Sequence, residues 1–545
     1  MADPFAVTNQ APPLEDVNFF TGDTPLRDAL RTHGEKADEA ALSAIGALAG
    51  SREALSHTLP ANQHPPVLRT HDRYGHRIDE VDFHPSWHWL MNQAVGFGLQ
   101  AAPWTSDRPS PHLTRAAGFY LWSQVEPGHG CPISMTYAAV PALRADDGLA
   151  AEWVPRLAAT SYDPRRAAPQ DKAGCLAGMG MTEKQGGSDV RANLTTATPS
   201  GTDGEYRLDG HKWFCSAPQV DVFLVLAQAP DGLSCFVVPR VLADGNRNVF
   251  ALQRLKDKLG NRSNASGEVE FHGTVGYRLG DEGAGVRTII EMVAATRLDC
   301  VLGSAALMRR ALVEATWNAS HRSAFGGVLR DKPAMQNVLA DLAIESEAAT
   351  TLAMRLAAAV DASVAGDEEA AAFRRIALPL AKFWVCKRTP PAVAEALECL
   401  GGNGYVEESG LPLLFRESPL NSIWEGSGTV NALDVLRALR RPESLEAWLT
   451  EVGTVRGADH RLDEAVTDVL ESLADLGDVE VRARRLASRM AVCLQASLLL
   501  RHSPAEVADA FVASRLAGDW GGVFGTLPRG TSLSIVVNRI FQPEE

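Results

Sequence analysis

Residues 421–428 read Asn-Ser-Ile-Trp-Glu-Gly-Ser-Gly and place one ionisable carboxylate, Glu425, between an indole and a pair of glycines. A carboxylate held against Trp424 loses part of its hydration, which raises its pKa and suits it to take a proton near neutral pH. Glycines at 426 and 428 let the backbone approach a flat ligand closely. The alternative is a helix N-terminus where Glu425 only complements the helix dipole. The stretch is therefore typical of either a catalytic base or a helix start.

A second stretch, residues 178–190, reads Gly-Met-Gly-Met-Thr-Glu-Lys-Gln-Gly-Gly-Ser-Asp-Val. A strand that enters a Thr and a Gly-Gly-Ser turn presents backbone N–H groups and hydroxyls at one edge, which suits a polar heterocycle. The spacing is not G-x-G-x-x-G, and G-x-x-x-x-G-K occurs nowhere, so neither a Rossmann pyrophosphate site nor a P-loop is supported. Residues 212–216, Lys-Trp-Phe-Cys-Ser, add an aromatic and a hydroxyl that can stack on a ring and hydrogen-bond to it. The alternative for this pentapeptide is a strand with a core aromatic.

The composition is that of an ordinary globular protein, with 45% apolar and 22% charged residues over 545 positions, and predicts three or four domains. A net charge of -15 argues against DNA or anionic membranes binding to the protein as a whole, so a polyanion requires a local patch. Eight scattered cysteines without a C-x-x-C pair predict reduced thiols and no metal site. We find no signal-like N-terminus and no run of 18 apolar residues, and expect a cytoplasmic protein with no membrane partner.

The order of patterns along the chain predicts an α+β protein. Residues 1–85 are expected to be irregular, with a short helix near Glu35–Leu55, and residues 86–175 to be helical. Short strands are expected at Tyr206, Val222, Cys235 and Glu268–Phe271, with a turn at Asp209-Gly210. Long helical patterns return over 285–440, break at Pro442 and continue to the end of the sequence.

Six short motifs together resemble the acyl-CoA dehydrogenase family from about residue 85 to 440. In order they are Met181-Thr-Glu…Gly-Gly-Ser188-Asp, Lys212-Trp-Phe-Cys-Ser216, Lys258-Leu-Gly260, Arg322-Ser-Ala-Phe325-Gly326, Gly401-Gly-Asn-Gly404 and Trp424-Glu-Gly-Ser427. The N-terminal arm and an extra C-terminal helical segment make the chain similar to the alkylation-response flavoproteins of bacteria within this family. The resemblance implies an N-terminal arm and helical domain (1–177), a β-barrel-like middle domain (178–283), a helical bundle (284–440) and a C-terminal helical, DNA-binding domain (441–545).

The resemblance also implies FAD, bound between the β domain and the C-terminal helices. Glu425 matches the base that removes the α-proton of an acyl-CoA, because the site that some relatives use instead holds Thr296 here, which cannot act as a base. Phe214 matches the aromatic beside the flavin, and Trp424 replaces a common Tyr, which narrows the acyl pocket. The implied cofactor-binding residues are Met181, Thr182, Gly187, Ser188, Phe214, Ser216, Arg322, Phe325, Gly401, Gly402, Trp424, Ser427 and Thr429.

Three positions depart from the family pattern around the adenine half of FAD. Ala324 stands where a hydroxyl is usual, Pro333 where a Gln is usual, and Glu398 where a second Gln is usual. A carboxylate facing a pyrophosphate is unfavourable by roughly 1 kcal/mol or more unless it is screened or paired. We therefore expect an altered adenine site or an altered arrangement of subunits, in a protein for which the family implies a homotetramer.

The C-terminal region, residues 441–545, carries 11 arginines, no lysine and 16 acidic residues. Arg482, Arg485 and Arg489 lie on one helical face at i, i+3 and i+7, and a second cluster is formed by Arg437, Arg440 and Arg441. Such faces can bind phosphates bidentately, and the family resemblance implies double-stranded DNA as the partner. The alternative is a solvated face that pairs with the acidic residues at 459–480.

Two further functions stay open at this point. One is a true acyl-CoA dehydrogenase for a short or branched acyl chain, such as isovaleryl-CoA, with no role on DNA. The other is a flavoprotein in which FAD is purely structural and an acyl-CoA or another small molecule is not turned over. The favoured function is a DNA-associated flavoprotein of the alkylation response with weak or no acyl-CoA dehydrogenase activity.

Overall fold

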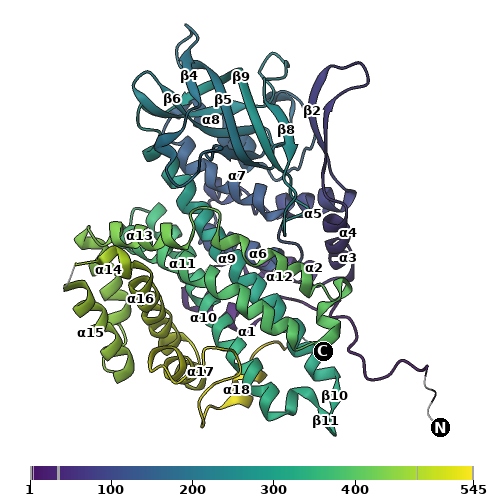
Figure 1. The fold of residues 1–545 in the computed structure, drawn as a ribbon, viewed down its shortest axis with the longest axis vertical. Coiled ribbons are helices and arrows are strands. Elements are labelled where there is room, and N and C mark those ends of the chain that lie inside the picture. The colour runs from purple at the N-terminus through teal and green to yellow at the C-terminus, as the bar shows by residue number, and fades with distance from the viewer. Residues whose placement is uncertain (1–2, 4, 34–36, 475–476, 543–545) are drawn as a thin grey trace. The chain divides into compact units, whose positions relative to one another are not determined.

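The computed structural model describes residues 3, 5–33, 37–474 and 477–542, and the chain divides into two compact units (Figure 1). The helical unit comprises Met1–Leu55, His112–Val125 and Cys300–Glu545. The sheet unit comprises Ser56–Pro111 and Glu126–Asp299. Helix α9 (Gly285–His321) runs from the end of the sheet unit into the helical unit.

In the described residues of the sheet unit, seven strands form one sheet, most of which closes on itself, and β1 and β2 form a separate hairpin. The strands β6 (Val222–Ala229) and β7 (Gly232–Pro239) pair along their whole length, β7 pairs with β9 (Ser266–Leu279), and β9 pairs with β5 (Glu205–Ser216). The strand β4 (Thr196–Pro199) pairs with both β5 and β6 and completes the ring. The expected β-barrel-like middle region is therefore confirmed. The remaining strands, each paired at one edge, are β3 (Ala177–Gly180) and β8 (Ala251–Leu255).

Helices and a hairpin complete the sheet unit. They are α4 (Thr58–Gln63), β1 (Val67–His71), β2 (Arg77–Asp82), α5 (Pro85–Gly96), η1 (Ala102–Thr105), α7 (Gly130–Leu143), α8 (Asp147–Ala158), η2 (Pro169–Asp171) and η3 (Val190–Ala192). The strand predictions at Tyr206, Val222, Cys235 and Glu268–Phe271 are confirmed by β5, β6, β7 and β9. Strands β6 and β7 are almost entirely buried, as their continuous apolar sequences predict.

The turn predicted at Asp209-Gly210 is wrong, because both residues lie inside β5. The register between β5 and β9 shifts at Leu208/Asp209, so the pair forms a β-bulge. Gly210 has a φ of +146°, and a Cβ there would lie 2.6 Å from Oγ1 of Thr195. The glycine therefore serves a bulge and a close approach rather than a hairpin.

The expectation for residues 1–85 is also wrong in part. The region holds the hairpin β1–β2, whose turn is fixed by Asp72: its carboxylate accepts hydrogen bonds from the backbone N–H groups of Tyr74 and His76 at 2.8 and 2.9 Å. The strand sequences are polar, and β2 is held by arginines from the sheet: Arg247 bonds to Glu80 at 2.6 Å. Near the predicted helix two helices occur, and the predicted start, Glu35, lies outside the described residues.

The helical unit is built around long, nearly buried helices. The helices α10 (Pro333–Val364) and α11 (Glu368–Glu398) pack against one another, and Asp367 caps α11 by accepting the N–H of Ala370 at 3.0 Å. The other elements are α1 (Thr24–His33), α2 (Glu39–Ala49), α3 (Arg52–Ser56), α6 (Pro111–Ser123), β10 (Ser323–Ala324), β11 (Gly327–Val328), η4 (Leu329–Asp331), η5 (Gly401–Tyr405), η6 (Glu407–Ser409), α12 (Leu411–Glu417), η7 (Leu420–Ser422), α13 (Gly428–Ala438), α14 (Pro442–Gly453), α15 (His460–Ala474), α16 (Val479–His502), α17 (Ala505–Phe511), η8 (Val512–Leu516) and α18 (Leu533–Asn538).

The C-terminal helices belong to the same core. Trp448 of α14 is fully buried, and its Nε1 donates to the carbonyl of Met490 in α16 at 3.3 Å. Glu451 accepts from Arg355 of α10 at 2.7 Å, which ties α14 to the bundle. The predicted helical character of 441–545 is confirmed, with the expected break at Pro442. None of the helices in the described part of the chain has the length and apolar character needed to cross a bilayer.

Candidate active site

In the sheet unit, the candidate residues lie where β3 ends. Met181 and Thr182 follow the strand, and the carbonyl of Thr182 accepts the N–H of Trp213 at 2.8 Å. Two backbone hydrogen bonds between Glu183 and Gly186 close the following turn. A Cβ on Gly187 would lie 2.3 Å from Oγ1 of Thr182, so this position accepts only a glycine without a shift of its neighbour. The two predicted motifs at 178–190 and 212–216 are thus brought together.

A buried ion pair fixes the two motifs to each other. Nζ of Lys212 lies 2.7 Å from Oε1 of Glu183, and both side chains are fully inaccessible to solvent. Glu183 also accepts from the backbone N–H groups of Leu194 and Thr195, and Lys212 donates to the carbonyl of Leu226 at 2.7 Å. Burial alone would raise the pKa of Glu183, but Lys212 and the hydrogen-bond donors outweigh it and lower the pKa to about 2. The pair is therefore a charged clamp beneath the turn.

The aromatic residues of the second motif lie in different environments. The side chain of Phe214 is 52% exposed, which leaves a ring face available for a flat ligand. Nζ of Lys256 lies 3.4 Å from the centre of the Trp213 ring and 4.7 Å from that of Phe214, a cation–π arrangement that holds both rings. Ser216 ends β5 and is partly exposed, and Ser188 is exposed in the turn.

In the helical unit, the candidate residues lie in the loop between η7 and α13. Glu425 is half-buried there and has a φ of +58°, in the left-handed region that few residues other than glycine adopt. Nζ of Lys382, a side chain only 1% exposed, donates to the carbonyls of Asn421 at 2.5 Å and Gly426 at 3.2 Å. The indole N–H of Trp424 donates to Oδ1 of Asn421 at 3.0 Å. These bonds fix the loop on both sides of Glu425.

Further donors hold the start of α13. Nδ2 of Asn431 donates to the carbonyls of Gly426 at 2.7 Å and Ser427 at 3.1 Å. Ser427 is the N-cap of α13, and Thr429 is exposed in its first turn. The alternative interpretation of residues 421–428 was a helix start, and α13 does begin three residues after Glu425. This helix start is compatible with a catalytic role for Glu425.

The residues expected near the adenine half of FAD lie along one edge of the helical unit. Phe325 is 94% exposed, and Gly401 and Gly402 are exposed at the start of η5. Oε1 of Gln10, from the N-terminal arm, accepts from Arg322 and from Asn403, each at 3.3 Å. The arm thus bridges the motifs that contain Arg322 and Gly401-Gly402.

The three residues that depart from the family pattern lie in different elements. Ala324 lies in the short strand β10, and Pro333 is the first residue of α10. Glu398, the last residue of α11, is exposed. An exposed carboxylate at this helix end is screened by water, which lowers the repulsion expected from it.

Three residues that support the site were not assigned a role from the sequence. Lys212 and Glu183 lie within the motifs, but the motifs assign no role to them. Lys382 lies outside all six motifs. The signal for Lys382 is a single lysine within an otherwise apolar stretch of α11, Pro379-Leu-Ala-Lys-Phe383. A lysine in such a position is buried only if acceptors are supplied to it, as the two loop carbonyls do here.

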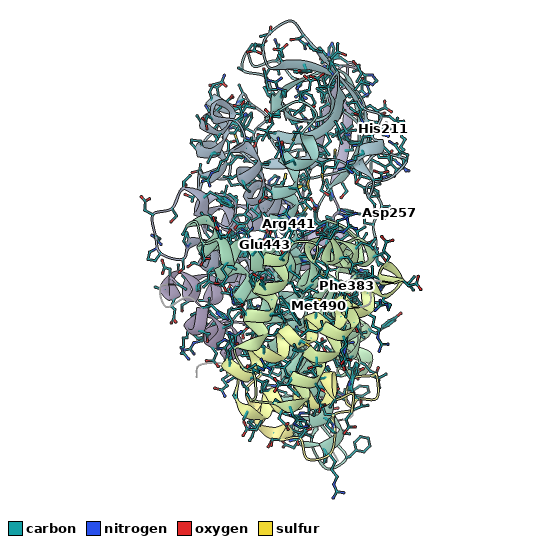
Figure 2. The ribbon with its side chains drawn as sticks, turned by 90° about the vertical axis from the view of Figure 1, so that its left-hand side faces the viewer. His211, Asp257, Phe383, Arg441, Glu443 and Met490 are labelled. Atoms are coloured by element: carbon teal, nitrogen blue, oxygen red, sulfur yellow. The ribbon has the colours of Figure 1, made fainter. Side chains whose placement is uncertain are left out.

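The six candidate arginines differ in what they contact. Arg437, Arg440 and Arg441 are exposed at the end of α13 and the start of α14, and Figure 2 shows Arg441 near Glu443. Among the described residues, no guanidinium contact is found for these three. In contrast, Arg482 donates to the carbonyls of Ser472 and Gly477 at 3.1 and 2.8 Å.

Arg489 and Arg485 complete the second group. Arg489 lies 3.5 Å from Asp468 of α15, a loose ion pair with the acidic stretch. Arg485 is exposed. The predicted face on α16 is therefore partly used for contacts with the preceding helix and loop, which is what the alternative of a solvated, paired face implies.

The chain belongs to the acyl-CoA dehydrogenase family. The family's middle-domain model matches residues 178–274 and its C-terminal-domain model residues 283–440, while residues 9–164 match the model of the adaptive response protein AidB N-terminal domain. The putative acyl-CoA dehydrogenase AidB of Escherichia coli (strain K12) is 47% identical over 470 residues, which cover 86% of each chain. The chain is thus an AidB-like member of the family. The six motifs predicted the family, and the N-terminal arm with the extra C-terminal helical segment predicted the AidB-like branch.

Two further comparisons agree with this assignment. Acyl-CoA dehydrogenase family member 11 of Caenorhabditis elegans is 32% identical over 80% of this chain and 76% of its own length. The crystal structure of Caenorhabditis elegans ACDH-11 in complex with C11-CoA superposes with a TM-score of 0.84, over 99% of this chain and 93% of that one, at 27% identity. The predicted fold, with helical N- and C-terminal regions and a strand-rich middle region, is confirmed.

The cofactor of the family is FAD, and the residues of the sheet unit fit it. The exposed ring of Phe214 offers a stacking face, and the Thr182 and Ser216 hydroxyls lie on segments joined by the Trp213–Thr182 backbone hydrogen bond. The close approach at Gly187 lets the turn lie flat against Thr182. Thr182, Phe214 and Ser216 are the residues that would hold the flavin ring.

Proposed function

We propose that this chain is an FAD-binding flavoprotein of the adaptive response to DNA alkylation. It binds double-stranded DNA through its C-terminal region, has weak or no acyl-CoA dehydrogenase activity and assembles as a homotetramer. The observation that supports DNA binding most is the cluster of Arg437, Arg440 and Arg441, three exposed guanidinium groups without a carboxylate partner among the described residues. In a chain of net charge -15, such a local patch is what binding to a polyanion requires. The similarity to AidB over most of the chain supports the biological role.

The chemistry proposed for Glu425 is the proton abstraction of the family's reaction, retained at a low rate or lost. In this chemistry, Glu425 takes the α-proton of an acyl thioester, and a backbone N–H near it polarises the thioester carbonyl. FAD, held by Thr182, Phe214 and Ser216, would supply the acceptor for a hydride from the β-carbon. Lys382 and Asn431 hold the loop so that the carboxylate is positioned without rearrangement. The indole of Trp424, fixed by Asn421, adds bulk in place of the usual phenol ring, which accounts for weak turnover.

Replacing the three arginines tests DNA binding. The triple variant Arg437→Ala/Arg440→Ala/Arg441→Ala is expected to weaken binding to a duplex at least about tenfold and to lower the salt slope of log K by about 3, because each lost phosphate contact removes about 0.9. Binding is measured by electrophoretic mobility shift over a series of salt concentrations. FAD absorbance should be unchanged.

The matched control removes three positive charges from the sheet unit instead of the helical unit. Arg191, Arg207 and Arg287 are exposed there, and their triple alanine variant should retain wild-type affinity. A further variant, Arg482→Ala, should reduce binding less than the cluster variant because this guanidinium is used by backbone carbonyls. Equal loss in the cluster and control variants, or no shift with wild-type protein at low salt, would rule out the proposed surface.

The second candidate function is a true acyl-CoA dehydrogenase for a short or branched chain, with no DNA role. The observation that favours it is the set of hydrogen bonds that fixes the loop around Glu425, donated by Lys382 and Trp424. A protein in which FAD is purely structural does not need this loop to be fixed. Anaerobic addition of isovaleryl-CoA or butyryl-CoA would bleach the flavin absorbance within seconds if this function holds. Under the first proposal we expect bleaching at least about a hundredfold slower than that, or none, since displacing the thioester from Glu425 by about 1 Å, as the bulk of Trp424 would, costs about this much in rate.

A further inference from the structure

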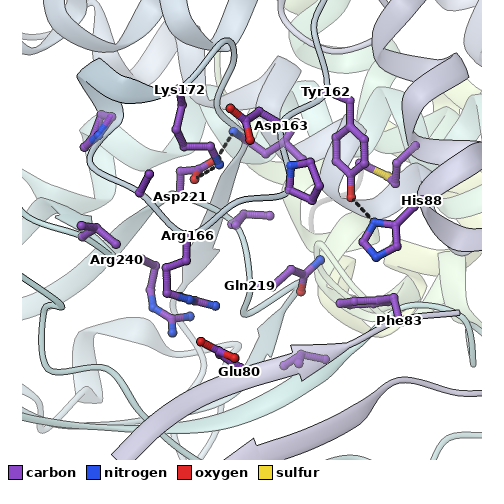
Figure 3. Close-up of a pocket in the computed structure, with 18 of the residues that line it drawn as sticks. Glu80, Phe83, His88, Tyr162, Asp163, Arg166, Lys172, Gln219, Asp221 and Arg240 are labelled. Carbon is purple, nitrogen blue, oxygen red and sulfur yellow. Dashed lines mark hydrogen bonds and ion pairs between the residues drawn. The ribbon is translucent and has the colours of Figure 1, made fainter. Parts of the chain in front are cut away.

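The sheet unit contains a cavity of about 520 Å³ that none of the candidate flavin residues lines. It lies among β2, α5, the segment after α8 and the ends of β6 and β7, and Figure 3 shows its labelled side chains. Its wall combines apolar side chains with charged ones, an arrangement typical of sites for small organic ligands. The wall contains four acidic residues, two arginines, an aromatic ring and an amide: Glu80, Asp82, Asp163, Asp221, Arg166, Arg240, Phe83 and Gln219.

Each carboxylate of the cavity has a cation of its own. Glu80 pairs with Arg247 at 2.6 Å and with Arg69 at 3.1 Å, and Asp82 pairs with Arg69 at 2.6 Å. The other two acidic residues are paired in the same way: Asp163 with Arg165 at 2.6 Å, and Asp221 with Lys172 at 2.5 Å. The negative charge of the wall is therefore compensated by residues other than Arg166 and Arg240.

The two remaining cations, Arg166 and Arg240, have no carboxylate within ion-pair distance among the described residues. Arg240 is 4% exposed and donates only to carbonyl oxygens, those of Pro218 and Asp79. The Nε atoms of both arginines are buried without a hydrogen-bond partner in the described part of the chain. Figure 3 shows the two guanidinium groups next to each other, near Glu80.

Two adjacent, desolvated guanidinium groups are unfavourable unless an anion joins them. Burial, and then the neighbouring Arg247, lowers the pKa of Arg166, and the nearby carboxylates Glu80, Asp221 and Asp79 offset only part of this effect. Burial followed by Arg166 lowers the pKa of Arg240, against a partial opposite effect of Asp79. Desolvating an uncompensated charge costs several kcal/mol in general, so such pairs persist where a ligand supplies the counter-charge. The planar fork of a guanidinium suits an oxyanion, which it can bind through two parallel hydrogen bonds.

We propose that this cavity binds a small organic anion whose phosphate or carboxylate head lies between Arg166 and Arg240. The apolar part of the ligand lies against Phe83 and Met91, and the hydroxyl of Tyr162, bonded to His88 at 2.8 Å, marks the polar edge. Burial lowers the pKa of His88, so this imidazole adds no positive charge at neutral pH. The site is separate from the flavin residues and does not depend on the proposed function.

Calorimetric titration of the FAD-loaded full-length protein tests the site. The probes are phenyl phosphate, benzoate and inorganic phosphate, each at the same ionic strength set with sodium chloride. Phenyl phosphate is expected to bind at least about tenfold more tightly than inorganic phosphate, because it alone also buries an apolar ring against the wall. Benzoate compares a carboxylate head with a phosphate head on the same ring, and the tighter of the two identifies the ligand class.

Arg166→Met should weaken phenyl phosphate binding at least about tenfold, whereas Arg287→Met, at an exposed position of the same unit, should change it less than about twofold. In anion-free buffer Arg166→Met should have an unchanged or raised Tm, because it removes an uncompensated charge; a purely structural arginine would lower Tm instead. If Arg166→Met fails to fold, Arg166→Lys retains the charge and should still weaken binding about threefold, since an ammonium cannot bond bidentately. Equal binding to wild type and these variants, or no binding of any probe, would overturn the proposal.

Discussion

Lys212→Met is expected to lower the free energy of unfolding by about 3–5 kcal/mol, because it leaves the carboxylate of Glu183 buried without its cation. Both side chains are fully inaccessible, so water cannot replace the lost partner. The turn that carries Thr182 and Gly187 rests on this pair, and we therefore expect loss of FAD together with the loss of stability. Urea unfolding followed by tryptophan fluorescence, with flavin absorbance measured in parallel, checks both expectations.

The matched control for Lys212→Met removes both charges at once. Glu183→Leu/Lys212→Met should recover part of the lost stability, since an apolar pair avoids the desolvation of either charge but leaves the N–H groups of Leu194 and Thr195 without their acceptor. A single variant as stable as wild type would show that the pair is not the clamp proposed here. The pH dependence has a definite sign: the pKa of Glu183 is lowered to about 2, so its stabilisation is complete above its ordinary value near 4.5 and is lost as the pH falls toward 2.

Glu425→Gln is expected to reduce any acyl-CoA dehydrogenase activity at least about a hundredfold, since removal of a general base costs about a hundred- to ten-thousandfold in rate. Gln has nearly the same shape and is also unbranched at Cβ, so the loop backbone should be retained. FAD content should therefore equal that of wild type. The rate of flavin bleaching by isovaleryl-CoA or butyryl-CoA under anaerobic conditions, divided by bound FAD, is the measurement.

Ile423→Ala is the control for Glu425→Gln, because Ile423 lies in the same loop but is 63% exposed. It should leave the bleaching rate within about threefold of wild type, as surface substitutions commonly do. If Glu425→Gln retains a rate within tenfold of wild type, Glu425 is not the base. The result is informative even for a slow enzyme, because single-turnover bleaching is followed for hours.

Local patterns predicted the strands of the sheet well and its irregularities poorly, while the closed sheet was implied by the family resemblance. Strands β6 and β7 are continuous apolar runs, and such runs specify buried strands without help from the rest of the chain. The bulge at Asp209-Gly210 depends instead on Thr195, which lies just before β4 and approaches the glycine closely. The hairpin β1–β2 is polar and is stabilised by arginines such as Arg247, over 150 residues away in sequence. Contacts of this kind leave no local signal.

The candidate site shows the same division. The motifs made Thr182, Phe214 and Glu425 candidates because each lies in a short stretch with a distinctive order of residues, and their roles stay predictions. The clamps under them, Lys212 with Glu183 and Lys382 with the carbonyls of Asn421 and Gly426, are long-range pairings. Helical spacing correctly placed Arg482 and Arg489 on one helix, but it could not show that backbone carbonyls and Asp468 occupy them.

The backbone at position 425 restricts how this loop can be engineered. With a φ of +58° it penalises β-branched replacements, whereas Gly, Asn and Asp enter that region readily. A saturation library at this codon would therefore return soluble protein mainly for small or unbranched amino acids, whatever reaction is selected for. Among these, Asp retains a carboxylate on a side chain one methylene shorter. New reactivity is therefore best sought by changing the residues that face the carboxylate.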